Sequence, residues 1–329
     1  MRIEVLKDFE LVDMIFEFQK LDILRRYRGV GDFRLTLNNL EYTNSLEIDN
    51  IIYFNNEAYI IQNYQKYKNI QNEMNFIVSG KHINSILERR VLLPSVTINT
   101  TETYEVQMRN LINTHFINPA DPNRKINNLV LANLKGYPYI PTTTSTLEDM
   151  TVREALTQLS SKVGLGYNLI CDIENKQFIF EVIEGQDKTE EVFFSEEFGN
   201  VLDSEIYKKT DESINVCYLN NSGAITSTGI GIGLNRKEAI IPGQNISEAT
   251  EEIERRKDII SAECEIAMTD QFVYKEDWDL GDIVTFIDKT LGFIVERPVL
   301  EIKEYYTDRL DIDVVFGDRV PTIFEKMGW

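Results

Sequence analysis

The sequence predicts a β-rich α+β fold in which strand-rich segments at both ends surround a mixed middle region. Short runs of alternating or β-branched apolar residues, separated by close turns, fill residues 1–95 and return from residue 204 onward. Helical spacing of apolar residues is limited to a few segments. With 329 residues, 43% hydrophobic and 27% charged, the chain is long enough for about two or three domains with buried cores.

Residues 1–95 are expected to form a small β-barrel or sandwich. The segment IIYFNNEAYII predicts a hairpin, because Asn55 and Asn56 tolerate the positive φ that a tight hairpin turn needs. NYQKYKNIQNEMNFIVSG then repeats the strand pattern with a longer turn. After Gly80, the apolar spacing in KHINSILERRV predicts a helix, which Pro94 stops.

Residues 96–203 are expected to form a compact α+β domain. A helix is predicted over residues 101–116 by the apolar stripe of Tyr104, Met108, Leu111 and His115. Thr151 and Glu154 match a capping box, which predicts the start of the next helix. The strands GYNLICDI and KQFIFEVI follow around a short turn.

The last third of the chain reads mainly as strands. SEIYKKT and INVCYL resume the strand pattern, and GDIVTFI, GFIVERPVLEI and LDIDVVFG end it. Between them, Asn245 and Glu248 predict a capped helix over residues 245–260.

The charge of the chain argues against nucleic-acid recognition. The formal net charge is −20, with 54 acidic and 34 basic residues. Affinity for nucleic acid depends largely on cations that displace counterions, so we expect no specific nucleic-acid binding. The same charge suits a surface past which DNA slides without sticking.

The cysteine usage and the expected lack of a signal peptide indicate synthesis in a reducing cytoplasm. Cys171, Cys217 and Cys264 are far apart and form no CxxC pair, so neither a zinc site nor a disulfide framework is predicted. The N-terminal segment is broken by acids, and we expect no signal peptide. No run approaches ~20 apolar residues, so no membrane span is expected either.

No catalytic, cofactor or metal site is predicted. His82 and His115 lack a partner at ligand spacing, and no nucleophile motif accompanies them. Gly229, Gly231 and Gly233 in TGIGIGLN have neither the spacing nor the GK[ST] ending of a phosphate loop. They indicate a flexible hairpin, or a strand with one face kept bare for close packing.

The stretch DWDLGDIVTFI contains acids that could suggest a carboxylate site, but it is better interpreted as a turn that leads into a strand. Gly281 stands where the chain swings inward and φ is expected to be positive. Asp279 and Asp282 flank the turn, where a short carboxylate accepts backbone N–H bonds. Trp278 is expected to give the turn an apolar lid.

A similar turn into a strand is predicted near the start, in GVGDFRLTLN, where Gly31 and Asp32 precede a strand that begins with Phe33. These two segments, with GKHINSILERRVL between them and VLEIKEYYTDRLDIDVVFG after them, follow one another in a characteristic order. In this order the chain resembles the tail-hub proteins of tailed phages, especially the hub family of siphophages, which is related to the baseplate hub of contractile tails.

The resemblance implies two small tube-type β-barrels with an inserted side domain. The first barrel would consist of residues 1–95, completed by 204–242, and the second of residues 243–329. Residues 96–203 would form the peripheral α+β domain. Three chains would form a ring of six barrels that joins a sixfold tail tube to a threefold tip.

The resemblance also implies partners and a place in the particle. We expect a homotrimer at the virion tail tip that lets DNA pass during ejection, has no enzymatic activity and contacts tail-tube, distal-tail, tape-measure and tip or spike proteins. The chain lacks the long C-terminal extension of many siphophage hubs, so another subunit is expected to degrade the host wall. Contractile tails, non-contractile tails and domesticated tail particles remain open, as do a wall-degrading enzyme and a carbohydrate-binding tail module.

Overall fold

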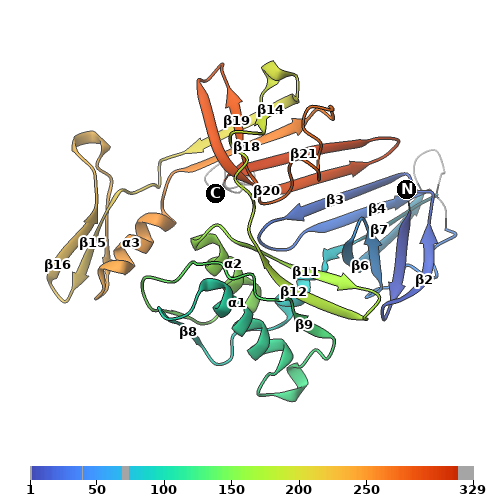
Figure 1. The fold of residues 1–329 in the computed structure, drawn as a ribbon, viewed down its shortest axis with the longest axis horizontal. Coiled ribbons are helices and arrows are strands. Elements are labelled where there is room, and N and C mark those ends of the chain that lie inside the picture. Colours follow the sequence, from blue (N-terminus) through green and yellow to red (C-terminus); the bar gives the residue numbers. More distant parts are fainter. Residues whose placement is uncertain (1, 39, 69–73, 318–329) are drawn as a thin grey trace. The chain divides into compact units, whose positions relative to one another are not determined.

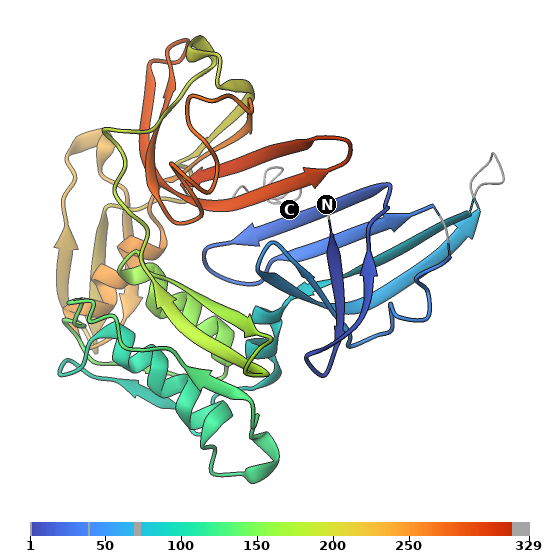
Figure 2. The same ribbon diagram turned by 45° about the vertical axis from the view of Figure 1, so that its right-hand side comes forward.

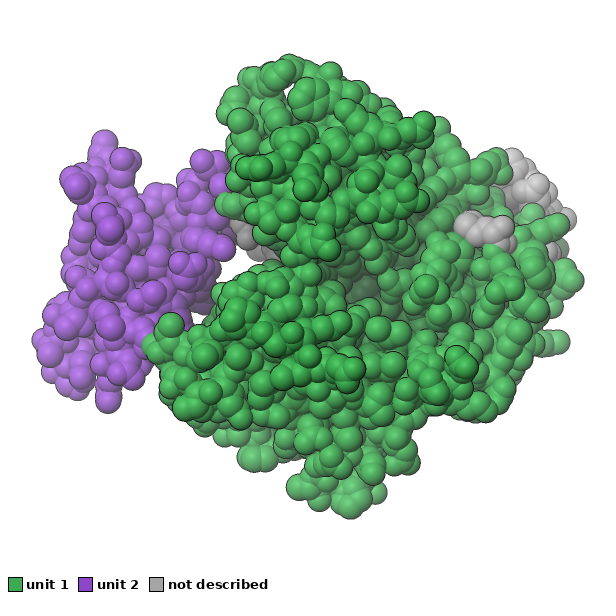
Figure 3. All heavy atoms as spheres, viewed as in Figure 1, with its two compact units in different colours: residues 1–203, 264–316 green, residues 204–263, 317–329 purple. Residues whose placement is uncertain are grey.

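The computed structural model describes residues 2–38, 40–68 and 74–317. The chain divides into two compact units (Figure 3). The larger unit is built from the residues up to 203 together with 264–316, and the smaller unit from residues 204–263.

The larger unit is built on a long sheet that joins the two ends of the sequence. The strands before residue 95 are β1 (Ile3–Lys7), β2 (Glu10–Ile15), β3 (Lys20–Arg26), β4 (Asp32–Leu37), β5 (Ile51–Phe54), β6 (Glu57–Lys68) and β7 (Met74–His82). The strands near the end are β18 (Ile259–Ile266), β19 (Ile283–Asp288), β20 (Phe293–Tyr306) and β21 (Leu310–Gly317). The strand order is β14-β18-β21-β20-β3-β4-β7-β6-β5-β1-β2, where β14 is Val201–Lys209. β19 and the short β13 (Phe193–Phe194) branch from β20.

β20 connects the late strands to the early ones. Its first half, up to Pro298, pairs with β19, and its second half pairs with β21 on one side and with β3 on the other. In the antiparallel pairing with β3, Glu304 lies opposite Ile23. Figures 1 and 2 both show β20 beside β3. Residues almost 300 positions apart therefore share one sheet.

The predicted β-rich α+β class is confirmed, but the closed barrels that the resemblance implied are not formed by the described residues. The strand order of the long sheet runs from β14 to β2 without returning on itself, so both strands remain edges. Residues 318–329 of the expected second barrel lie outside the described residues. The predicted turn at Asn55 and Asn56 is present, with φ values of 50° and 64° between β5 and β6.

The middle of the chain adds helices and two small sheets to the larger unit. Its helical elements are η1 (Ile83–Arg89), α1 (Tyr104–Ile112), η2 (Asn113–Ile117), η3 (Pro122–Arg124), α2 (Val152–Lys162) and η4 (Glu196–Phe198). Its strands are β8 (Val96–Ile98), β9 (Leu129–Leu131), β10 (Ser145–Leu147), β11 (Gly166–Asp172) and β12 (Gln177–Ile183). β10 pairs with β8, and β11, β12 and β9 form a three-stranded sheet.

Residues 96–203 were expected to form a compact domain with its own core. Instead, this middle region shares a core with the first strands. Ile60 packs in one apolar cluster with Met108 and Phe180, while the adjacent Ile61 belongs to a second cluster. Successive residues of a strand point to opposite faces. The first sheet is therefore covered on both faces, which explains the uninterrupted apolar runs in its sequence.

Two of the expected helices differ from their prediction. The segment after Gly80 forms a 3₁₀-helix, η1, and the helix predicted over residues 101–116 passes from α1 into a π-helical turn at Asn113. The capping box before α2 is confirmed: the Glu154 carboxylate accepts from the Thr151 N–H at 2.7 Å, and the Thr151 hydroxyl accepts from the Glu154 N–H at 3.2 Å.

The smaller unit is a three-stranded sheet with one helix. Its elements are β15 (Val216–Asn221), β16 (Ala224–Gly229), η5 (Gly233–Asn235), β17 (Glu238–Pro242) and α3 (Ile246–Arg255), with β15 in the centre of the sheet. Ala249 of α3 is buried with Cys217 and Leu219 of β15. The start of α3 agrees with prediction, since the Glu248 carboxylate accepts from the Asn245 N–H at 3.3 Å.

Residues 204–242 were expected to complete the first barrel, yet β15, β16 and β17 pair with one another. The reason is local: α3 follows β17 directly and supplies apolar side chains that cover one face of these strands. A sheet with one covered face can have a small core of its own. β14 and β18 each begin in one unit and end in the other.

Candidate functional site

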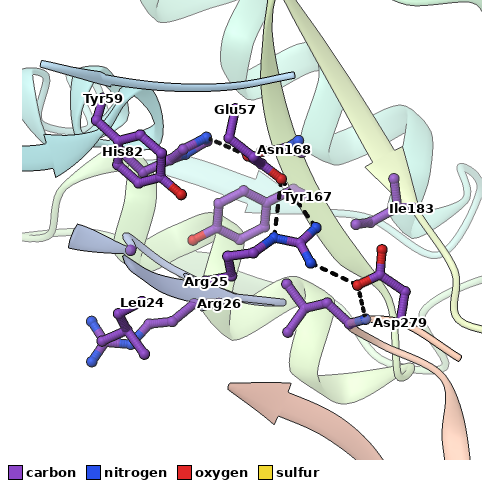
Figure 4. A pocket seen from close by; sticks show the side chains of 12 residues that line it. Leu24, Arg25, Arg26, Glu57, Tyr59, His82, Tyr167, Asn168, Ile183 and Asp279 are labelled. Atoms are coloured by element: carbon purple, nitrogen blue, oxygen red, sulfur yellow. Dashed lines mark hydrogen bonds and ion pairs between the residues drawn. The ribbon is translucent and has the colours of Figure 1, made fainter. Parts of the chain in front are cut away.

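Charged side chains gather inside the larger unit around Arg25 (Figure 4). Arg25 lies on β3, and its side chain is only 12% exposed. Its Nη1 donates to Asp279 Oδ1 at 2.7 Å and to the Tyr274 hydroxyl at 2.6 Å, while its Nε donates to Glu57 Oε1 at 3.1 Å. Burial opposes the charge of Arg25, but Tyr274, Glu57 and Asp279 outweigh this effect and raise its pKa. This guanidinium therefore holds β3 to β6 and to the segment before β19.

Glu57 also contacts a histidine. His82, at the end of β7, places Nε2 3.0 Å from Glu57 Oε2, and its Nδ1 accepts from the Asn84 N–H at 3.2 Å. Burial favours the neutral form of the Glu57 carboxyl, but His82 and then Arg25 outweigh it and lower the pKa of Glu57 to about 2. At neutral pH this carboxyl is therefore ionised and has no proton to give.

A second carboxylate, Glu304 of β20, is 1% exposed and fully enclosed by donors. It accepts hydrogen bonds from the hydroxyls of Tyr274 and Tyr306, and Lys275 Nζ lies 3.2 Å away. Burial raises the pKa of both tyrosines, so both hydroxyls keep their protons. Arg25, Tyr274 and Glu304 thus form a continuous chain of donors and acceptors. We call Arg25, Glu57, His82, Tyr274, Asp279 and Glu304 the buried charge cluster; Asp279, whose side chain is 41% exposed, lies at its edge.

A cavity of about 130 Å³ lies beside this cluster. Its lining includes Arg25, Glu57, Tyr59, His82 and Asp279 (Figure 4). The lining carboxylates, Glu57 and Asp279, both pair with Arg25, and Glu57 also contacts His82. A catalytic acid or base needs a proton that it can exchange near working pH. The cluster has the geometry of an internal clasp between distant strands.

The turn 277–282 directly precedes β19. Asp282 Oδ2 accepts from the Asp279 N–H at 3.0 Å, and its Oδ1 accepts from the Gln186 N–H at 2.8 Å. Gly281 has φ of 96°. Asp279 has a further role that the sequence did not suggest, because its carboxylate faces Arg25.

Trp278 lies beneath this turn and is 1% exposed. Its ring meets Phe194 edge-on, with ring centroids 5.2 Å apart, and lies 5.0 Å from the ring of Tyr274. Its Nε1 donates to the carbonyl of Phe272 at 3.3 Å. The tryptophan is therefore part of the core beneath the turn, not a lid over it.

The earlier turn at Gly31 works differently from the one at Gly281. Gly31 does not have positive φ; it is needed because a Cβ there would lie 2.0 Å from the carbonyl oxygen of Leu24. Asp32 is exposed at the start of β4, and Phe33 is 2% exposed and packs edge-on against Tyr59. Of the residues singled out in the two turns, Gly31 and Asp279 line the same cavity, whereas the others do not.

Little in the sequence indicated that Arg25, Glu57 and Glu304 would come together. The available signal is a charged residue at an inward position of an alternating strand, as Glu304 is between Ile302 and Tyr306. His115 is a different case: it is fully buried in η2, neither ring nitrogen has a hydrogen-bond partner, and burial lowers its pKa. Among the described residues, no group of three or more His, Cys, Asp or Glu side chains is arranged to hold a metal ion.

Comparison with known proteins identifies the family. Over residues 5–318 the sequence matches the family described as siphovirus ReqiPepy6 Gp37-like protein. The chain belongs to this family. No curated protein matches its sequence. In the part of the chain that the structure describes, no helix is both long and apolar enough to cross a membrane.

Three solved structures of tail proteins share the fold. The tail protein from Neisseria meningitidis MC58 has a TM-score of 0.61 at 13% identity, covering 96% of each chain. The 43 kDa tail protein of prophage MuSo2 from Shewanella oneidensis has a TM-score of 0.61 at 14% identity, covering 96% of this chain and 98% of the other. Prophage tail protein gp18 from Listeria monocytogenes EGD-e has a TM-score of 0.62 at 11% identity, covering 100% of this chain and 98% of the other. The expected resemblance to phage tail proteins is thereby confirmed.

Proposed function

We propose that this protein is the structural hub of a phage tail tip. Three copies form a ring that joins the sixfold tail tube to the threefold tip and leaves an axial passage for DNA. The observation that carries the proposal is the fold shared with tail proteins over almost the full length of both chains. Its neighbours in the particle are then tail-tube, distal-tail, tape-measure and tip or spike proteins.

The charge of the chain supports this role. A passage for DNA must not bind phosphate groups, and a protein with a net charge of −20 repels them. We therefore expect no shift of labelled double-stranded DNA in a gel at physiological salt, even at high protein concentration.

The buried charge cluster supports an architectural role over an enzymatic one. Its acids pair with Arg25 and Lys275, Glu57 also contacts His82, and Glu57 remains ionised at neutral pH. Purified protein is therefore expected to release no soluble fragments from bacterial cell walls. Release of glycan or peptide fragments would instead support a wall-degrading enzyme.

Assembly tests the proposal directly. Light scattering coupled to gel filtration should give a species of three times the chain mass, either alone or with the tail-tube protein, and electron microscopy should show a ring with an open centre. Antibody labelling of purified phage should place the protein at one end of the tail. Labelling along the whole tube, or on the capsid, would contradict the proposal.

A further inference from the structure

A patch of positive charge lies on the larger unit, where the segment after η1 packs beside η3. Arg89 and Lys125 are exposed, and Arg90 and Arg124 are half-buried. Two hydrogen bonds hold these segments together: Arg90 Nε donates to the Arg124 carbonyl at 3.1 Å, and Arg124 Nη2 donates to the Val91 carbonyl at 2.6 Å. We call Arg89, Arg90, Arg124 and Lys125 the basic patch.

The positive charge of the basic patch is not balanced by nearby acids. Among the described residues, none of its four cations forms an ion pair with a carboxylate. The acids nearest to it in the sequence bind elsewhere: Glu88 pairs with Lys81 at 2.9 Å and with Arg153 at 3.1 Å, and the Asp121 carboxylate accepts from the Asn123 N–H at 2.9 Å. In a chain with 54 acidic and 34 basic residues, this patch therefore keeps its charge for a partner.

Exposed aliphatic side chains and an ordered guanidinium complete this surface. Val91 is 48% exposed and Leu93 is 62% exposed. Arg90 Nη1 donates to the Arg89 carbonyl at 2.8 Å, and the guanidinium of Arg90 lies 5.9 Å from the ring centroid of Phe116. A side chain that is ordered before binding loses less conformational entropy when a partner covers it. The segment therefore has the properties of a preformed contact surface.

The chemistry of the basic patch fits an acidic protein surface better than a nucleic acid. A phosphate backbone is bound by cations that displace counterions, and it would leave Val91 and Leu93 uncovered. A protein surface can pair with the cations and cover the aliphatic side chains as well. The chain itself supplies such a surface, because its net charge of −20 leaves each copy with a surplus of carboxylates. Charge complementarity therefore favours a second copy of this chain.

We propose that the basic patch of one copy binds an acidic surface of the next copy in the ring. This contact deepens the proposed function, on which it rests, by naming one side of the interface between copies. The basic patch and an acidic surface are different parts of the chain, so the contact is head-to-tail. Head-to-tail contacts can close into rings, and they do not require identical surfaces to meet on the axis. The contact is therefore compatible with an open centre.

Reversal of charge at the two exposed positions tests the contact. In the sample that contains the trimer, with or without the tail-tube protein, Arg89→Glu/Lys125→Glu is expected to weaken association of the copies at least tenfold by sedimentation, because acids then face acids. Lys66→Glu/Lys68→Glu is the matched control: it changes the net charge equally at exposed positions of β6 and should associate like the unaltered protein. Circular dichroism should show an unchanged fold for both variants.

Crosslinking identifies the partner. A carbodiimide joins a lysine amine directly to a carboxylate that contacts it. In a trimer assembled from isotope-labelled and unlabelled copies, mass spectrometry should find Lys125 joined to an Asp or Glu of a differently labelled copy. Lys125→Arg keeps the charge, so it should associate like the unaltered protein while this crosslink disappears.

Each other outcome overturns the proposal. Unchanged association of Arg89→Glu/Lys125→Glu, or crosslinks from Lys125 only within one copy, would show that copies meet elsewhere. Equal weakening by Lys66→Glu/Lys68→Glu would assign the effect to net charge alone. A shift of double-stranded DNA in a gel that Arg89→Glu/Lys125→Glu abolishes would assign the basic patch to nucleic acid. Absence of a trimer from every sample would overturn the proposed function too, whereas a tail-tip trimer that the charge reversal leaves intact would overturn this contact alone.

Discussion

The ring of Tyr27 occupies the space beside Gly281: a Cβ at this glycine would lie 2.3 Å from the ring. The same ring would lie 2.4 Å from a Cβ at Gly166, and the Tyr27 hydroxyl accepts from the Gly185 N–H at 3.0 Å. Tyr27 thus sits in a cradle of three glycines from different parts of the larger unit. Burial raises its pKa to about 12, so the hydroxyl stays protonated and can also donate to a carbonyl.

This cradle predicts a large cost for Gly281→Ala. The substitution combines a strained φ of 96°, which costs about 1–2 kcal/mol, with overpacking against Tyr27, which adds about 1–3 kcal/mol. Gly292→Ala is the control, because Gly292 also has positive φ (63°) but has no atom within 4 Å of its Cβ position. Urea unfolding should show the larger loss for Gly281→Ala. Equal losses of unfolding free energy would contradict overpacking at Gly281 and would mean that the residues around Tyr27 can shift at little cost.

The buried charge cluster predicts that Arg25→Met strongly destabilises the larger unit. The substitution leaves Glu57, whose side chain is 18% exposed, without this cation, and removal of one partner from a buried ion pair costs about 3–5 kcal/mol. Arg34→Met, at an exposed position of β4, is the matched control and should change the free energy of unfolding by less than about 0.5 kcal/mol. Similar denaturation midpoints for the two variants would contradict a clasp at Arg25.

The lowered pKa of Glu57 predicts a pH dependence below neutrality. Folding lowers this pKa from 4.5 to about 2, so the unfolded chain binds more protons between these values. The contribution of Glu57 to stability, roughly 3 kcal/mol, is present above pH 4.5 and is lost as the pH falls toward 2. Glu57→Gln should therefore flatten the plot of unfolding free energy against pH in this window. Glu190→Gln, an exposed control, should keep the slope of the unaltered protein, and a parallel profile for Glu57→Gln would refute the assignment.

The capping box of α2 predicts a smaller effect. Thr151→Ala removes the hydroxyl that accepts from the Glu154 N–H and should lower the free energy of unfolding by about 1 kcal/mol. Thr142→Ala, at an exposed position outside any helix, should have almost no effect. Thermal denaturation of both variants, compared at equal protein concentration, measures the difference.

The features that could be predicted depend on residues close together in the sequence. The turn at Asn55 and the caps at Thr151 and Asn245 each rest on the chemistry of a few consecutive residues. The 3₁₀ form of η1 could not be predicted in this way. There the Asn84 side chain donates to the carbonyl of Gly29 and accepts from the Leu169 N–H, so distant backbone fixes the segment.

The candidate site shows the same limit. Asp279 and Gly281 were recognisable as parts of a turn, because glycine and a short acid have strong local preferences. That Asp279 pairs with Arg25 follows from the packing of segments about 250 residues apart, and neither residue is unusual in its own segment. Likewise, the shared core of the first and middle regions depends on Ile60 and Ile61 lying on opposite faces of β6.

The long strand β20 has a mechanical consequence. The first half of β20 is hydrogen-bonded to β19 and its second half to β3 and β21. Tension applied to β19 would therefore be transmitted through the backbone of β20 to β3 and β21. A pull along the strand loads many hydrogen bonds together in shear, and the arginine clasp on β3 anchors the receiving end. A pull along β20 would therefore be shared by its hydrogen bonds to β3, β19 and β21.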